Sequence, residues 1–387
     1  MPVLSLPTDS LPLLRRSHLV LAFLLHFYAH TSTKTGTSAL PIPPSISIPL
    51  VTVSNYLGVP PVVTYSDTVL YNFLPLDPAA PVSITNPPAR SLETFTNTRS
   101  EELFYVISAQ CEIAGAEALR LMRQSLDELF LADTVALRRL TTYLRKLAAQ
   151  ISLIGDITLS MIKHIDPEDF YHLIRPWFKG GDADGPSSLG WEFQGVDAGS
   201  TAESSKSDTG SLFSGPSAGQ SSLIHAIDIF LTVDHSPKEG IILDAAPVGA
   251  SNPNEATFVQ RMLQYMPLQH RSFLLHLSSH PTPLRQLVVA HATSQPKLAA
   301  AYDIALEALK GFREKHMRIV SIFIVQQARR QPSERIQRLI GPVVAPVGEL
   351  RGTGGSPLFK FLKRCRDNTT NAMIGKPAGP GFDLTEP

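Results

Sequence analysis

The feature that most constrains the fold is a pair of consecutive helical segments in the first half of the chain. Apolar residues recur with a helical period over residues 100–129 (SEELFYVISAQCEIAGAEALRLMRQSLDEL) and again over residues 133–165. Ser100 is a possible N-cap of the first segment. The same spacing resumes after residue 219, and its longest run extends from about Lys297 to Arg330. Because strand-like segments are almost absent, the sequence predicts an all-α fold.

Three stretches break the helical pattern. Residues 40–64 are rich in proline, which removes backbone donors, so we expect extended structure with short turns there. Residues 180–219 are rich in Gly and Ser and favour a loop with two apolar anchors, Trp191 and Phe193. A second loop is expected over residues 331–356.

The charge balance and the cysteines narrow the class of protein. The 34 Lys and Arg residues equal the 34 Asp and Glu residues in number, so no global basic field would attract nucleic acid. Cys111 and Cys365 are far apart in sequence and form neither a disulfide framework nor a CxxC site, which favours a reducing compartment. These observations predict a cytoplasmic protein without a nucleic-acid partner.

The N-terminal apolar run admits two interpretations. LVLAFLLHFYAH follows Arg15 and Arg16, as the apolar core of a signal peptide would, but His26 interrupts the run and no clean cleavage site follows. The run is too short to cross a bilayer as a helix, and no other segment is a candidate for doing so. The alternative is an ordinary helix of a folded domain.

His316 is the most informative single residue. In GFREKHMRIVSIFIV (311–325) it falls in line with the apolar residues Phe312, Ile319 and Phe323, so it faces inward. An inward histidine can be a hydrogen-bonded core residue, a ligand of a metal or cofactor, or a catalytic base. The residues alone leave these three readings open.

Other histidines and one glycine-rich stretch have weaker functional readings. The HxxxH pairs His26–His30 and His276–His280 could place two rings on one helical face, as a zinc site requires, but no third ligand is placed for either. Ordinary interface histidines are the simpler reading. GTGGS (352–356) resembles a phosphate cradle, although no strand precedes it, and a flexible hinge or lid fits better.

Two charged residues lie in apolar sequence. Asp228 lies in a strongly apolar helix and requires a partner, for which Arg313 is a candidate. Arg175 lies in FYHLIRPWF, within a short helix that Pro176 ends or bends, and is either a solvated edge residue or an anion anchor.

The stretch GPSAGQSS (215–222) is built of small residues. Its backbone could approach a flat ligand closely, or the stretch could be a loop that ends in an ordinary helix cap. The residues leave both readings open.

Read together, these segments resemble the indoleamine 2,3-dioxygenase family, heme enzymes that open the pyrrole ring of tryptophan. Seven segments carry the resemblance in the family's order: GVPPVVTYSDTVLYNF, ELFYVISAQCEIAGA, DFYHLIRPWFKG, GPSAGQSSLIHAIDIFL, QYMPLQHRSFL, FREKHMRIV and RGTGGSPLFKFLK. The resemblance implies a helical heme-binding catalytic domain over residues 61–375, with flexible loops at 180–215 and 331–356 and a disordered tail at 376–387. Residues 1–60 would be the remnant of a truncated N-terminal small domain and a linker, which makes LVLAFLLHFYAH a domain helix.

The resemblance also assigns roles to individual residues. His316 would be the proximal ligand of the heme iron, with Arg313 on a heme propionate and Asp228 supporting that arginine. Phe170 would pack on the indole and Arg175 would bind the substrate carboxylate. The remaining pocket positions implied are the distal Ser108, with Tyr65, Thr68, Phe104, Ser217, Ala218 and Thr353, of which Ser217 would also lie beside the heme.

The family further implies an activity and its reactants. Heme b, kept ferrous by an electron donor, would insert both atoms of O2 into L-tryptophan or another indoleamine, giving N-formylkynurenine on the route to NAD. The enzyme would be a monomer without a membrane partner. Tyr171 stands where a second phenylalanine is common, and Pro216 replaces a glycine found in some members. Two alternatives are a heme-binding paralogue with little tryptophan turnover, such as a sensor, and a non-catalytic helical protein.

Overall fold

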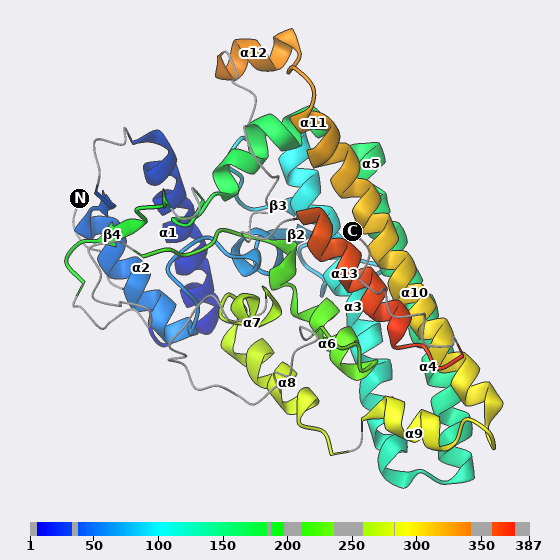
Figure 1. Ribbon diagram of the computed structural model, residues 1–387. Coiled ribbons are helices and arrows are strands. Elements are labelled where there is room, and N and C mark those ends of the chain that lie inside the picture. Colours follow the sequence, from blue (N-terminus) through cyan, green and yellow to red (C-terminus); the bar gives the residue numbers. More distant parts are fainter. Residues whose placement is uncertain are drawn as a thin grey trace, which may run out of the picture.

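The structure, a computed structural model, describes residues 6–32, 38–183, 187–196, 211–235, 258–281, 283–341 and 358–375. Helices dominate, which confirms the predicted fold class (Figure 1). The α-helices are α1 (Leu11–Thr31), α2 (Pro44–Leu57), α3 (Arg99–Leu131), α4 (Thr134–Leu159), α5 (Met161–His164), α6 (Ser222–Phe230), α7 (Phe258–Leu263), α8 (Leu268–Ser278), α9 (Leu284–Ala290), α10 (Pro296–Val320), α11 (Gln326–Ala328), α12 (Glu334–Ile340) and α13 (Leu358–Asn371).

Shorter elements connect these helices. The strands are β1 (Leu40–Ile42), β2 (Phe73–Pro75), β3 (Pro88–Ser91) and β4 (Trp191–Phe193). β1 pairs with β4 in parallel, and β2 pairs with β3 antiparallel. Among the described residues, the π-helical segments are η1 (Ser66–Leu70), η2 (Asp169–Ile174) and η6 (Ser321–Val325). The 3₁₀-helical segments are η3 (Arg175–Phe178) and η5 (Ala218–Gln220).

Helices α3, α4 and α10 run alongside one another and form the long side of the molecule (Figure 1). The N-cap of α3 is Thr98, whose side chain accepts from the backbone N–H of Glu101, so the prediction of Ser100 was two residues late. The cap works because Glu101 also reaches back and accepts from the backbone N–H groups of Phe95 and Thr96 at 2.7 and 2.6 Å, a variant of the capping box. Ser100 instead donates its hydroxyl to Asp169.

The proline-rich stretch was predicted wrongly as extended. Only Leu40–Ile42 is a strand, and Pro44–Leu57 forms α2. Pro44 lies in the first turn, where a helix needs no backbone donor, so only Pro49 removes a helical hydrogen bond. Burial of apolar residues such as Leu50 and Val53 stabilises the helix against that loss.

The long helix expected from about Lys297 to Arg330 is confirmed in extent, because α10, the π-helical η6 and α11 follow one another from Pro296 to Ala328. The π-turn within it was not predicted, and it carries an extra residue that rotates the side chains beyond it. One other predicted boundary was wrong. The loop expected over residues 331–356 contains α12, and its residues 342–356 lie outside the described part of the chain.

The buried apolar residues form two main cores. The first core is built around α1 and α2, and the second around α4 and α10. Both α3 and α10 pass from one core to the other: Ile107 and Ile319 belong to the first core, whereas Ala114 and Leu309 belong to the second. The stretches of α3 and α10 between these residues therefore lie at the junction of the cores.

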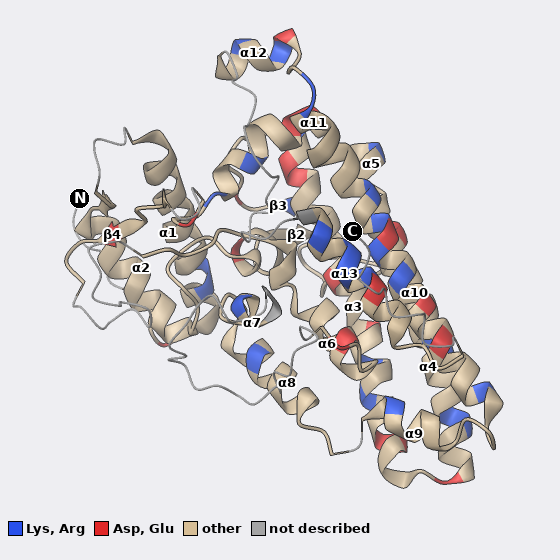
Figure 2. Cartoon of the chain, viewed as in Figure 1, with Lys and Arg blue, Asp and Glu red and all other residues tan. Residues whose placement is uncertain are grey.

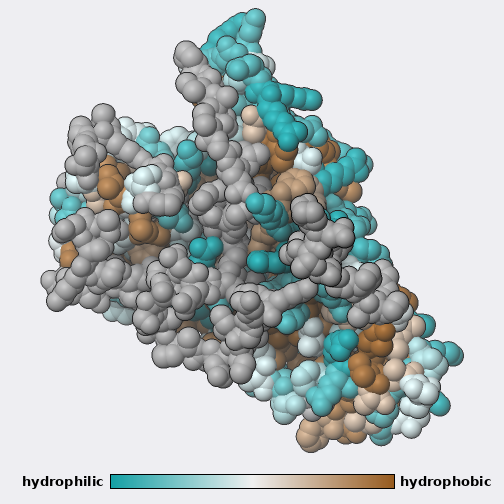
Figure 3. All heavy atoms as spheres, in the orientation of Figure 1, coloured by the Kyte–Doolittle hydropathy of each residue, from teal (hydrophilic) through white to brown (hydrophobic). Residues whose placement is uncertain are grey.

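The outer surface is mixed in character. Basic and acidic residues are interspersed along α10, whereas α4 and α13 carry mostly Lys and Arg (Figure 2). Hydrophilic residues cover α12, and hydrophobic residues are more frequent at the opposite end near α9 (Figure 3), where Phe130 at the end of α3 is 88% exposed. Within the described residues, no helix combines the length and the apolar character that crossing a membrane requires.

Candidate active site

The polar residues at the junction of the two cores begin with a buried ion pair. Arg313 of α10 donates from Nη2 to both carboxylate oxygens of Asp228 on α6, at 2.6 and 2.7 Å. Its Nη1 donates to the hydroxyl of Thr369 on α13. The predicted partnership of Arg313 with Asp228 is therefore confirmed, and it joins three helices at one point.

His235 extends this ion pair and was not found from the sequence. Its Nε2 lies 3.1 Å from Oδ2 of Asp228 and 3.4 Å from Nη2 of Arg313. Burial opposes the charged form, but the hydrogen bonds and charges of Asp228 and Cys365 raise the pKa of His235 to about 9. Burial likewise opposes ionisation of Asp228, but the Arg313 charge and the contact with His235 lower the pKa of Asp228 to about 2. The cluster thus holds two cations and one anion at neutral pH.

His316 follows Arg313 by one helical turn. Its ring keeps an accessible edge although protein surrounds it on most sides, and it makes no hydrogen bond to any described residue. Burial, together with the nearby charge of Arg313, lowers the pKa of His316 to about 4, so the imidazole is neutral at pH 7. A neutral ring on a rigid helix, with an available nitrogen lone pair, suits a heme iron ligand, which needs only one protein donor.

An aromatic cluster joins α3 to the segment after α10. The ring centroids of Phe104 on α3 and Phe170 on η2 are 4.9 Å apart, with planes tilted by 53°. Phe170 also meets Phe323 of η6 edge-on at 5.6 Å. Because η6 continues α10, the helix that carries His316 leads into the cluster that holds the predicted indole-packing residue.

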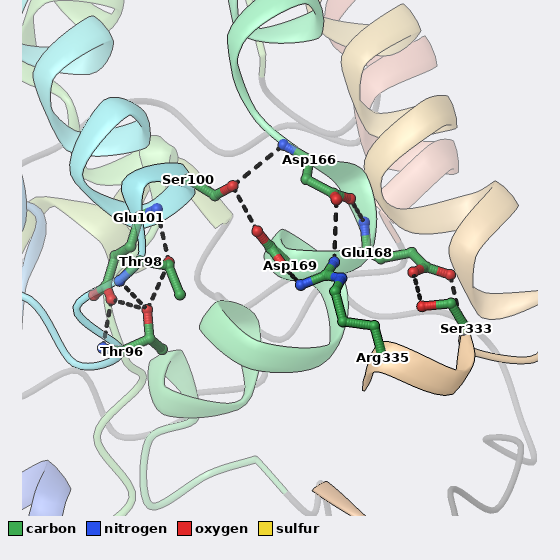
Figure 4. Close-up of polar contacts among 9 residues, drawn as sticks. All are labelled: Thr96, Thr98, Ser100, Glu101, Asp166, Glu168, Asp169, Ser333 and Arg335. Atoms are coloured by element: carbon green, nitrogen blue, oxygen red, sulfur yellow. Dashed lines mark hydrogen bonds and ion pairs between the residues drawn. The ribbon is translucent and has the colours of Figure 1, made fainter. Parts of the chain in front are cut away.

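The short segment that carries Phe170 and Arg175 is fixed by polar contacts at its start (Figure 4). Asp169 accepts from Ser100 Oγ at 2.8 Å and from Arg335 Nη1 at 2.7 Å, which ties η2 to the start of α3 and to α12. The segment was expected to be a short helix bent at Pro176, and it is a π-turn that passes into the 3₁₀ turn η3. These contacts determine where Phe170 and Arg175 lie.

Arg175 opens η3 beside an aromatic ring. Its guanidinium lies over the ring of Tyr171 at 5.5 Å from the centroid. Burial lowers the pKa of Arg175, although an arginine remains charged in a protein. A mostly buried cation of this kind fits the anion-anchor reading better than the solvated-edge reading.

Ser108 lies four residues after Phe104 on α3. Its hydroxyl donates to the Phe104 carbonyl at 2.8 Å within the helix. With its proton engaged in this way, the hydroxyl oxygen can accept a hydrogen bond but is a poor base. The side chain therefore contributes polarity rather than proton abstraction.

Tyr65 and Thr68 lie at the start of η1 and are both buried. The Tyr65 hydroxyl donates to Glu112 of α3 at 2.9 Å, and its backbone N–H donates to the side chain of Gln220 at 2.8 Å. The Thr68 hydroxyl lies 3.3 Å from the Thr64 carbonyl oxygen and 3.5 Å from the Tyr65 carbonyl oxygen, and it can donate to either. Tyr65 therefore links α3 to the loop before α6.

That loop contains the predicted Ser217 and Ala218. Ser217 accepts from the backbone N–H of Gly219 at 3.3 Å, and Ala218 is exposed. We had expected small residues in this loop to let its backbone approach a flat ligand. At Gly215 the structure gives another reason for a glycine, because a Cβ there would lie 2.0 Å from the carbonyl oxygen of Phe178. Gly215 allows backbone to pack on backbone.

The HxxxH pairs do not form zinc sites. His26 and His30 contact the carbonyls of Trp177 and Lys179, at 2.8 and 3.0 Å, as interface histidines would. His280 lies beyond the end of α8 at Ser278, so it does not share a helical face with His276. Within the described part of the chain, no group of three or more His, Cys, Asp or Glu side chains could hold a metal ion.

Some functional residues were missed, and one cannot be placed. Glu112 follows Ser108 by one turn of α3, so its carboxylate lies on the same inward face of the helix. A carboxylate at such a position could have marked Glu112 as a site residue from the sequence. His235 and Thr369 gave no such signal, because their contacts depend on how α6 and α13 pack. Thr353 lies outside the described residues.

Comparison with known proteins identifies the family. The family model of indoleamine 2,3-dioxygenase matches residues 1–372. Indoleamine 2,3-dioxygenase of Saccharomyces cerevisiae is 31% identical over 375 residues, which cover 92% of this chain and 77% of the relative. Indoleamine 2,3-dioxygenase 1 of Mus musculus is 28% identical, covering 96% of this chain and 84% of the relative. The 6-hydroxytryptophan 2,3-dioxygenase of Fusarium equiseti is 26% identical, covering 93% of this chain and 81% of the relative. The chain therefore belongs to the indoleamine 2,3-dioxygenase family of oxidoreductases.

Proposed function

We propose that this enzyme is a heme-dependent dioxygenase that opens the indole ring of L-tryptophan with O2 to give N-formylkynurenine. The observation that carries the proposal is His316, a neutral imidazole without a hydrogen bond to any described residue, one turn after the buried Arg313. A partly buried, neutral histidine without a hydrogen bond to a described residue has a ring nitrogen free to bind a ligand.

The cluster beside His316 would bind the edge of the cofactor. Arg313, Asp228 and His235 together carry a net positive charge at neutral pH, and a buried net charge favours a counter-ion. The carboxylates of heme b supply such a counter-ion. Heme b held by His316 would supply the iron chemistry that activates dioxygen.

The remaining residues would position the substrate. Arg175 would pair with the carboxylate of tryptophan, and Phe170, with Phe104, would pack against the indole. Ser108 would supply a polar contact without acting as a base, because its proton is engaged with the Phe104 carbonyl. The protein would thus contribute position and polarity rather than proton transfer.

The biological setting follows from this chemistry as part of the proposal. N-formylkynurenine is a step from tryptophan toward NAD, and a separate electron donor would keep the iron ferrous. We further propose that the enzyme acts as a monomer in the cytoplasm.

The decisive experiment is to measure N-formylkynurenine formed from L-tryptophan by the purified, heme-loaded protein with a reductant in air. His316→Ala should lose heme and activity together, whereas the exposed His276→Ala should retain both. A parallel assay with 6-hydroxytryptophan tests the substrate named for the Fusarium relative. An intact heme spectrum without product from either substrate would favour a heme-binding paralogue, and failure to bind heme would contradict the proposal.

A further inference from the structure

A second histidine, far from His316 in the sequence, has an unusual set of partners. Nδ1 of His18 on α1 lies 2.7 Å from Oδ1 of Asp67, and both side chains are 2% exposed. Nε2 of the same ring lies 3.2 Å from the carbonyl oxygen of Pro60. A carboxylate and a carbonyl can only accept hydrogen bonds, so both ring nitrogens must donate. With Asp67 ionised, this geometry fits a charged imidazolium.

His26, two turns further along α1, shows the contrasting case. Its Nδ1 donates to the Trp177 carbonyl at 2.8 Å, and its Nε2 accepts from the backbone N–H of Val63 at 3.3 Å. One donor and one acceptor suit a neutral ring, and burial lowers the pKa of His26 to about 3. The two buried histidines of α1 therefore hold opposite charge states.

Asp67 connects His18 to the turn that carries Tyr65 and Thr68 of the candidate site. Its other oxygen, Oδ2, accepts from both the backbone N–H and the hydroxyl of Thr64, each at 2.8 Å. These bonds close the turn that leads into η1. Tyr65 and Thr68 lie within this turn, on either side of Asp67. One carboxylate thus fixes the turn internally and anchors it to α1.

We propose that His18 is a positioning residue, which through Asp67 holds the turn of residues 64–68 in place and so sets the affinity of the pocket for its indole substrate. The proposal rests on the proposed function for the identity of the substrate and for the place of Tyr65 and Thr68 in its pocket. The ion pair and its hold on the turn are properties of the resting protein.

The charge of His18 makes this device depend on pH. Burial opposes the charged form, but the charge and hydrogen bonds of Asp67 and Pro60 raise the pKa of His18 above its usual value. Because the folded-state pKa is raised, the ion pair stabilises the folded protein fully below about pH 6.5. This stabilisation is lost as the pH rises through the folded-state pKa of His18. A cavity of about 20 Å³ adjoins the pair, which is room for about one water molecule to exchange the proton.

The other ionisable groups around the pair titrate elsewhere. Burial raises the pKa of Tyr71 above 10, although Arg15 over its ring at 4.4 Å opposes this. Burial and Arg15 lower the pKa of His270 on α8 below 6.5, and His26 titrates near 3. A transition between about pH 6.5 and pH 10 that depends on Asp67 therefore reports on His18.

The first test is hydrogen exchange of the resting protein, measured by mass spectrometry between about pH 6 and pH 10. Amides of residues 64–71 should be protected at low pH and lose protection, relative to α4, as His18 deprotonates. Asp67→Asn keeps the shape but removes the charge, so it should weaken protection at every pH, and His18→Gln should abolish the pH dependence. The exposed His276→Gln should behave as the unaltered protein. A pH-independent protection in the unaltered protein would overturn the proposal, even if a variant failed to fold.

The second test is steady-state kinetics of the heme-loaded enzyme with L-tryptophan. His18→Gln and Asp67→Asn should raise KM by about tenfold or more and change kcat less, because the turn positions substrate rather than reacting with it. In the unaltered enzyme KM should rise across the same pH range as the loss of protection. An unchanged KM in both folded variants would overturn the role of the pair in the pocket. Exchange that follows the prediction in a protein without turnover would support the ion pair and contradict the proposed function.

Discussion

Removing Asp228 should destabilise the protein strongly, because it would leave the charge of Arg313 in the interior without its carboxylate partner. Arg313 is 8% exposed, and Asp228 accepts both hydrogen bonds from its Nη2. In Asp228→Ala the remaining described partners of Arg313 would be the hydroxyl of Thr369 and the ring of His235. Breaking a buried ion pair from one side costs about 3–5 kcal/mol, a large part of the total stability of about 5–15 kcal/mol.

The assay is urea unfolding of the heme-free protein, followed by circular dichroism. Asp228→Leu combined with Arg313→Met removes both charges, and it should recover most of the loss because an apolar pair of similar volume replaces the ions. Glu334→Ala serves as the control, since its contact with Arg338 is on the surface, with side chains 85% and 80% exposed, and should change stability by less than about 1 kcal/mol. A loss below about 1 kcal/mol in Asp228→Ala would refute the reasoning.

Three further predictions concern single side chains. Gly215→Ala should lower the free energy of unfolding in urea by about 3 kcal/mol, because the new Cβ would meet the Phe178 carbonyl. Gly311→Ala should raise that free energy by about 0.5–1 kcal/mol, because a Cβ there would meet no other described segment within 4 Å. Equal effects of the two substitutions would contradict this contrast. In the unaltered protein, stability should fall as the pH rises through about 9, and this fall should be smaller in His235→Gln, where the part that the His18–Asp67 pair contributes remains. Arg175→Ala should raise KM for tryptophan at least tenfold, with Arg175→Lys intermediate, and an unchanged KM would remove Arg175 from the site.

Elements with a regular period were predictable from the sequence, and irregular ones were not. α3, α4 and α10 have an apolar stripe that repeats every 3.6 residues because each packs along its whole length. α2 was missed because proline counts against a helix on average, whereas its cost depends on the position within the helix. The π-turns were missed because one extra residue in a turn leaves no mark on composition.

The candidate site divides in the same way. The pairing of Asp228 with Arg313 was predictable because a buried charge needs a partner, whichever helix supplies it. The importance of His18 and Asp67 was not predictable in this way. Their importance depends on the contact between α1 and the start of η1, and the local sequence of either segment does not predict such a tertiary contact.

The contact between Gly180 and Gly215 has a mechanical consequence. A Cβ on Gly180 would lie 2.2 Å from the carbonyl oxygen of Phe213, so the two backbones touch without side chains between them. One backbone continues from Arg175, and the other leads to Ser217. Side chains between two segments can change rotamer and absorb a shift, but bare backbones in contact have no such slack. We therefore expect the arginine that would hold the substrate and the loop that would face the cofactor to move together, so that occupancy of one site would influence the other.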